Sequence, residues 1–125
     1  ARGGYALAEP DSDPDVILIG TGSEVAVALD AAATLTAAGR SVRVVSMPCT
    51  ELFAGQDDAY RNAILPPGVP TVSVEAGVTF GWERWADRSV GIDRFGASAP
   101  GDRVMAELGI TATAVVEAAE SLLTA

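Results

Sequence analysis

The chain has 125 residues, 49% of them hydrophobic, which is enough to bury one core as a single domain over 1–125. Eight basic and 17 acidic side chains give a formal net charge of −9. Such a surface repels nucleic-acid phosphates and anionic lipid, so we expect neither nucleic acid nor membrane as a partner. The sequence also lacks an apolar run of membrane-spanning length and a signal pattern at its start.

Histidine is absent from the sequence. Its absence removes the commonest general base and the commonest metal ligand, so we predict no catalytic and no metal-binding residue in this chain. Cys49 is the single cysteine, which excludes a disulfide within the chain and fits a reducing cytoplasm. With no histidine to activate its thiol, Cys49 is expected to line the core as a small side chain.

Apolar runs bounded by glycine and proline predict strands that alternate with helices. The run over 16–19 is continuously apolar, as expected for a strand covered on both faces. An apolar stripe at helical spacing predicts a helix over 24–38, with Gly39 as its C-terminal cap. Further strands are predicted over 5–7, 42–45, 71–74 and 89–92, and further helices over 57–62, 102–108 and 112–123, the last with Thr111 as N-cap. This alternation predicts a mainly parallel sheet with helices on both faces.

The first candidate site is the loop after the strand over 16–19, formed by Gly20, Thr21, Gly22, Ser23 and Glu24. Its glycines permit a tight turn, and the N–H groups at the start of the following helix can hold a phosphate or a carboxylate. Alternatively, Thr21 and Glu24 form a capping box that satisfies those amides internally, which is the interpretation that we favour. Val25 replaces the third glycine of a dinucleotide-binding fingerprint, so a dinucleotide is not expected.

The second candidate site begins at Glu75, directly after the predicted strand over 71–74. Open α/β sheets place functional side chains at this end of their strands. Glu75 either acts as an acid or base or, as we favour, accepts hydrogen bonds from neighbouring amides and fixes a loop. The aromatic residues Phe80, Trp82 and Trp85 either form a contact patch for another domain or cover this domain's own core.

A further signal lies in a series of segments along the chain: 3–7 (GGYAL), 14–25 (PDVILIGTGSEV), 44–53 (VVSMPCTELF), 60–61 (YR), 65–67 (LPP), 74–77 (VEAG), 80–82 (FGW) and 92–100 (IDRFGASAP). In order and spacing, these segments resemble the C-terminal domain of transketolase. The last segment also contains Asp93, Arg94 and Ser98, a polar cluster before a proline. Together the segments cover nearly the whole chain.

The resemblance implies a three-layer α/β/α fold. Its five-stranded, mainly parallel mixed sheet would carry one antiparallel edge strand near Tyr5. It also implies a cytoplasmic, homodimeric parent enzyme that transfers a two-carbon ketol unit between sugar phosphates with thiamine diphosphate and Mg²⁺ or Ca²⁺. In that family the cofactor ligands and the substrate-holding residues lie in the preceding domains, and none maps onto this chain. The implied partners are therefore those preceding thiamine diphosphate-binding domains, and this chain alone is expected to be inactive.

Two alternatives stay open at the level of sequence. The chain is a stand-alone anion- or nucleotide-binding α/β module that uses the loop over 20–24, or it is the assembly subunit of a split transketolase.

Overall fold

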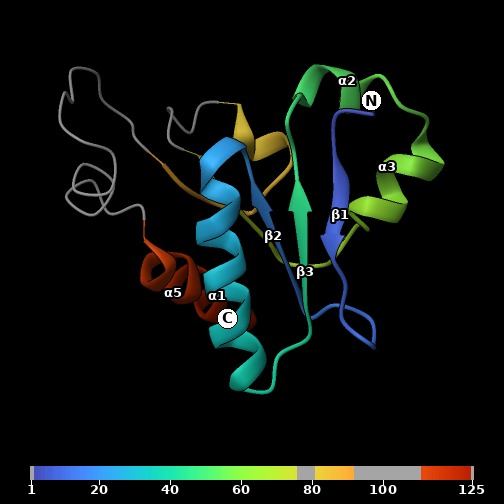
Figure 1. Ribbon diagram of the computed structural model, residues 1–125. Helices are drawn as coiled ribbons and strands as arrows, with labels where there is room; N and C mark the ends of the chain where they lie inside the picture. The colour runs from blue at the N-terminus through green and yellow to red at the C-terminus, as the bar shows by residue number, and fades with distance from the viewer. Residues whose placement is uncertain (1, 76–80, 92–110, 125) are drawn as a thin grey trace, which may run out of the picture.

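A computed structural model describes residues 2–75, 81–91 and 111–124. Within these ranges five strands form one sheet in the order β1-β3-β2-β4-β5, and helices cover both of its faces (Figure 1). The strands are β1 (Tyr5–Ala8), β2 (Val16–Gly20), β3 (Val42–Ser46), β4 (Thr71–Val74) and β5 (Arg88–Val90). The helices are α1 (Val25–Ala37), α2 (Thr50–Ala54), α3 (Asp58–Ile64) and α5 (Ala112–Leu123), with the 3-10 turns η1 (Gly22–Glu24) and η2 (Trp82–Arg84).

The expected mixed sheet is confirmed. Strand β1 pairs antiparallel with β3, whereas β2 pairs parallel with both β3 and β4, and β4 pairs parallel with β5. All five residues of β2 are buried, as its unbroken apolar sequence predicted for a strand covered on both faces.

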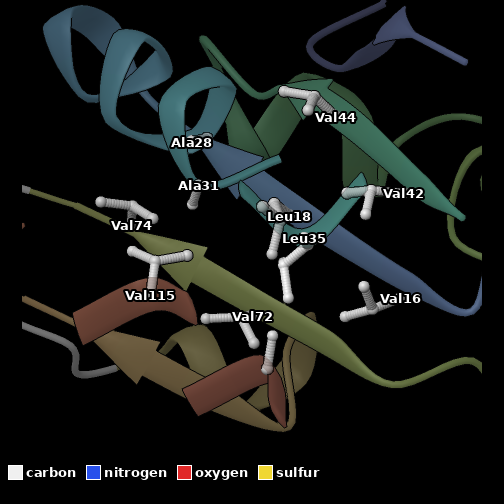
Figure 2. Close-up of a cluster of buried hydrophobic side chains, with 11 residues drawn as sticks. Val16, Leu18, Ala28, Ala31, Leu35, Val42, Val44, Val72, Val74 and Val115 are labelled. Atoms are coloured by element: carbon white, nitrogen blue, oxygen red, sulfur yellow. The ribbon is translucent and has the colours of Figure 1, made fainter. Parts of the chain in front are cut away.

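The two faces of β2 contribute to two separate core clusters. On one face, Val16 and Leu18 pack with Ala28, Ala31 and Leu35 of α1 and with residues of α5 (Figure 2). On the other face, the cluster is made of Ile17, Ile19, Val45, Met47, Phe53 and Trp82. Alternate side chains of β2 point to opposite faces of the sheet, so this one strand packs against the helices of both layers.

Most predicted elements are present, with boundaries within two residues of those expected. The helix over 112–123 begins after Thr111, whose hydroxyl oxygen accepts a hydrogen bond from the Ala114 N–H at 3.2 Å. Gly39 has a φ of 92°, the left-handed conformation expected of a C-terminal cap. Helix α2 was not predicted, because its five residues are too few for a helical period to be visible. The predicted helix over 102–108, Ile92 and the Asp93, Arg94 and Ser98 cluster lie outside the described residues.

Two arginines join separate elements of the fold. The Arg43 side chain on β3 donates to the carbonyl oxygens of Ala63 and Ile64 at 2.9 Å each, and it also forms an ion pair with Glu9. These bonds satisfy carbonyls at the end of α3 that have no partner within the helix. Arg40, after α1, pairs with Glu120 of α5 at 3.0 Å, and its hydrogen bond lowers the pKa of the Glu120 carboxyl.

Replacing Ile17 by Ala tests the role of β2 in the core. Ile17 is fully buried, so the substitution should lower the free energy of unfolding by about 2–5 kcal/mol through lost burial and a cavity. Urea denaturation measures this change. The matched control, Leu29→Ala on the exposed side of α1, should change it by less than about 0.5 kcal/mol. A parent chain that unfolds without a cooperative transition would contradict an autonomous domain.

Candidate functional site

The sheet order creates a crevice beside the end of β2. From β2 the chain crosses through α1 to β3 on one side, whereas β4 lies on the other side of β2. The loops that leave β2 and β4 therefore diverge, and open α/β sheets bind ligands at such a point. Thr21 follows β2 and Glu75 follows β4, so topology brings the two predicted sites together.

A short hydrogen bond joins these two sites. The Thr21 hydroxyl donates to a carboxylate oxygen of Glu75 over 2.6 Å. The predicted capping box is wrong, because the Thr21 side chain makes no capping hydrogen bond to the turn that follows it. The Glu24 N–H is instead satisfied by the Thr21 backbone carbonyl at 3.0 Å. The local sequence predicted that the Thr21 hydroxyl caps the following helix. In the structure this hydroxyl bonds instead to the carboxylate of Glu75, which follows the neighbouring strand β4.

The loop is shaped by its two glycines and by a buried carboxylate. A Cβ on Gly20 would lie 2.7 Å from the Val25 Cα, so no larger residue fits there, and Gly22 has a φ of 55°. Glu24 is only 4% exposed and accepts hydrogen bonds from the Ser23 hydroxyl at 3.2 Å. Its carboxylate lies at the start of α1, where negative charge complements the helix dipole.

A pocket of about 260 Å³ opens beside the Thr21–Glu75 hydrogen bond. It is lined by Thr21, Met47, Pro48, Thr50, Glu75, Gly81, Trp82 and Trp85. Trp82 is 7% exposed and packs in the core cluster on this face, so its ring covers the domain's own core. Phe80 lies outside the described residues. Among the described residues the lining contains the carboxylate of Glu75 and no basic side chain.

Cys49 departs from its expected position. It is half-buried and belongs to neither core cluster. Its N–H donates to the Gly3 carbonyl at 3.0 Å, and its Sγ lies 3.8 Å from a carboxylate oxygen of Glu51.

A larger hollow of about 670 Å³ lies at the opposite ends of the strands. Arg61, Arg84 and Arg88 line it together with Asp58, Glu83 and Asp87. Asp58 pairs with Arg61, while the other two carboxylates accept backbone N–H groups of Gly81 and Thr71. The charges in the hollow balance, and nothing in its lining selects one class of ligand.

The described residues contain neither a metal-ligand cluster nor a membrane-spanning helix. Across 2–75, 81–91 and 111–124, no three His, Cys, Asp or Glu side chains come together as a possible metal site. No helix in the same ranges has the length and apolar character needed to cross a membrane.

Comparison with known proteins places this fold in a family. Residues 3–111 match the family model described as the transketolase-like TK C-terminal domain. The chain belongs to the transketolase C-terminal domain family. It is 53% identical over 130 residues to transketolase 7 of Craterostigma plantagineum, covering 98% of this chain and 19% of that protein.

Solved structures agree with this assignment. The transketolase from Leishmania mexicana superposes with a TM-score of 0.92 at 46% identity, over 98% of this chain and 18% of that one. A split-gene transketolase, described as an inactive beta4 tetramer, superposes with a TM-score of 0.72 at 25% identity, over 99% of this chain and 43% of that one. The chain thus spans about one fifth of the curated transketolase that it matches.

Sequence reasoning found Thr21 and Glu75 but not their contact, and it missed Met47, Pro48 and Thr50 in the pocket lining. Thr21 and Glu75 each directly follow one of two neighbouring parallel strands. Knowing that these strands are neighbours would have predicted the contact, but a single sequence does not specify the order of strands in a sheet.

The Thr21–Glu75 bond can be tested with Thr21→Val, which keeps the shape of the side chain and removes the hydroxyl. We expect the free energy of unfolding to fall by about 1.5–3 kcal/mol, the usual range for a hydrogen bond to a charged group. Thermal denaturation of Thr50→Val is the control, since Thr50 lines the same pocket and has no side-chain hydrogen bond within the described residues. Equal losses in the two variants would show that the bond adds no stability.

Proposed function

We propose that this chain is the non-catalytic C-terminal domain of a transketolase, one domain over 1–125 that supports the preceding domains. The observation that carries the proposal is the match of the family's C-terminal domain over 3–111, in a chain that spans 19% of its relative. The proposed parent enzyme is a two-carbon ketol transferase that uses thiamine diphosphate and Mg²⁺ or Ca²⁺. A homodimeric and cytoplasmic parent is part of the same proposal.

The described residues of this chain do not fit the metal that accompanies the cofactor. A divalent metal bound to a diphosphate needs carboxylate or carbonyl ligands in one place, and the described residues contain no such cluster of three. Glu75 accepts the Thr21 hydroxyl, and Glu24 is buried beside Ser23. No step of ketol transfer is therefore assigned to this chain.

An assembly subunit of a split transketolase is a second candidate. It is favoured by the likeness to the split-gene transketolase, of which this chain covers 43%. Both candidates assign catalysis to other domains, and they differ only in whether those domains share the polypeptide.

The isolated chain should show no ketol transfer and no saturable binding of thiamine diphosphate, with or without Mg²⁺. The reason is the lack of a histidine for proton transfer and of a metal-ligand cluster among the described residues. Calorimetric titration with the cofactor measures binding. Saturable micromolar binding that thiamine analogues displace would overturn the assignment of catalysis to other domains.

A chimera tests the positive part of the proposal. This chain replaces the matching segment of Craterostigma plantagineum transketolase 7, and we expect the chimera to retain ketol transfer and to unfold at a higher temperature than the host without that segment. A folded chimera with no ketol transfer would contradict the proposed function.

The loop over 20–24 should bind phosphate, sulfate and nucleotides more weakly than millimolar. An incoming anion would meet Glu24 and Glu75, with no arginine within the loop itself, on a chain of net charge −9. A phosphate titration followed by NMR measures the backbone amide shifts. Saturating shifts confined to Thr21, Gly22 and Ser23 at sub-millimolar phosphate would revive the anion-binding module.

A further inference from the structure

The apolar side chains left in solvent are concentrated where the chain enters the sheet. Among the described residues, four large hydrophobic side chains are exposed: Tyr5 (48%), Leu7 (44%), Leu52 (52%) and Leu29 (39%). Tyr5 and Leu7 lie on β1, and Leu52 lies on α2 beside the segment that leads into β1. Leu29 is apart from them on α1, an element that packs against α5, β2 and β3.

The backbone brings α2 and the entry to β1 into direct contact. A Cβ on Gly3, two residues before Tyr5, would lie 2.8 Å from the Leu52 Cβ and 2.3 Å from the Cys49 carbonyl oxygen. The Cys49 N–H also donates to the Gly3 carbonyl at 3.0 Å. We call the exposed apolar residues of these two neighbouring elements, Tyr5, Leu7 and Leu52, the entry patch.

Strand β1 is the last strand at one side of the sheet. In the described part of the chain β1 pairs only with β3, and no strand lies along its outer edge (Figure 1). Tyr5 and Leu7 are its exposed residues, and the register of its pairing with β3 shifts between Ala6 and Ala8. The strand is short and irregular, but it has no charged residue and no proline, so two of the features that protect an edge from pairing are missing. Glu9 and Glu51 flank the entry patch as exposed charges, so an apolar centre has a polar border, as in protein interfaces.

The chain is held firmly at this point. The Tyr60 hydroxyl donates to the Gly4 carbonyl at 2.7 Å, and the Arg2 guanidinium lies 4.4 Å from the centre of the Tyr60 ring. A segment that joins residue 2 from upstream is therefore delivered beside the entry patch. The matched transketolase is about five times longer than this chain, and the matched model is that of a C-terminal domain, so the remaining sequence of such a protein lies upstream.

From this placement we propose that the entry patch is the docking surface for the domain that immediately precedes this one in the same polypeptide. The inference rests on the proposed function, because it needs an upstream domain. The preceding domain would present an apolar surface that buries Tyr5, Leu7 and Leu52 and covers the open edge of β1. Each of these side chains stabilises the contact by leaving water.

Hydrogen exchange in the chimera with Craterostigma plantagineum transketolase 7 tests the proposal. Amides of β1 and α2 should exchange about tenfold more slowly in the chimera than in the isolated chain, because docking excludes solvent and suppresses local opening. Equal exchange of β1 and α2 in the two proteins would overturn the docking surface, whether or not the chimera transfers a ketol unit. Loss of ketol transfer with β1 and α2 still protected would instead count against the proposed function alone.

A double variant, Tyr5→Ser with Leu52→Ser, separates docking from folding. It should remove the slower exchange in the chimera, whereas Leu29→Ser, the matched exposed residue on α1, should leave that difference unchanged.

Co-sedimentation is a second test, in which the isolated chain is mixed with the host that lacks its C-terminal segment. A complex of these two proteins that the double variant abolishes supports the proposal. If the two proteins form no complex and the chimera also fails to fold, the proposal is contradicted. A homodimer of the isolated chain that the double variant disrupts would assign the patch to a second copy and overturn the proposal.

Discussion

The burial of β2 on both faces is the constraint on which the rest of the structure depends. Its side chains alternate between two core clusters, so one strand holds both helical layers against the sheet. Burying an aliphatic side chain of this kind contributes about 1.5–3 kcal/mol. Both neighbours of β2 are parallel strands, and its end defines the crevice where Thr21 and Glu75 meet. The position of the candidate site is therefore a consequence of core packing.

The polar groups in that crevice hold the loops in place. The Thr21 hydroxyl bonds to Glu75 across the divergence of β2 and β4, and Glu24 is buried at the start of α1. The crevice lies where open α/β sheets bind ligands, and in this chain its polar side chains bond to one another across the two loops.

The hydrogen-bonded loops and the exposed apolar side chains lie in different parts of the surface. The strand ends carry the hydrogen-bonded loops, whereas the exposed apolar side chains gather at β1 and α2, where the chain enters the sheet. None of these exposed side chains belongs to either core cluster, so Tyr5, Leu7 and Leu52 can be substituted without removing a core residue.

Sequence by itself determined the buried strand over 16–19, the helix at 112–123 with its Thr111 cap, and the family, because periodicity, capping residues and segment order are local properties. Tertiary structure alone decided three features. The partner of Thr21 is Glu75, 54 residues away, rather than the nearby turn. The Trp82 ring lies in the core, and the short helix α2 is set beside Gly3. Each of these outcomes depends on which strands lie next to one another, and contacts across such distances in the chain leave no mark in its local pattern.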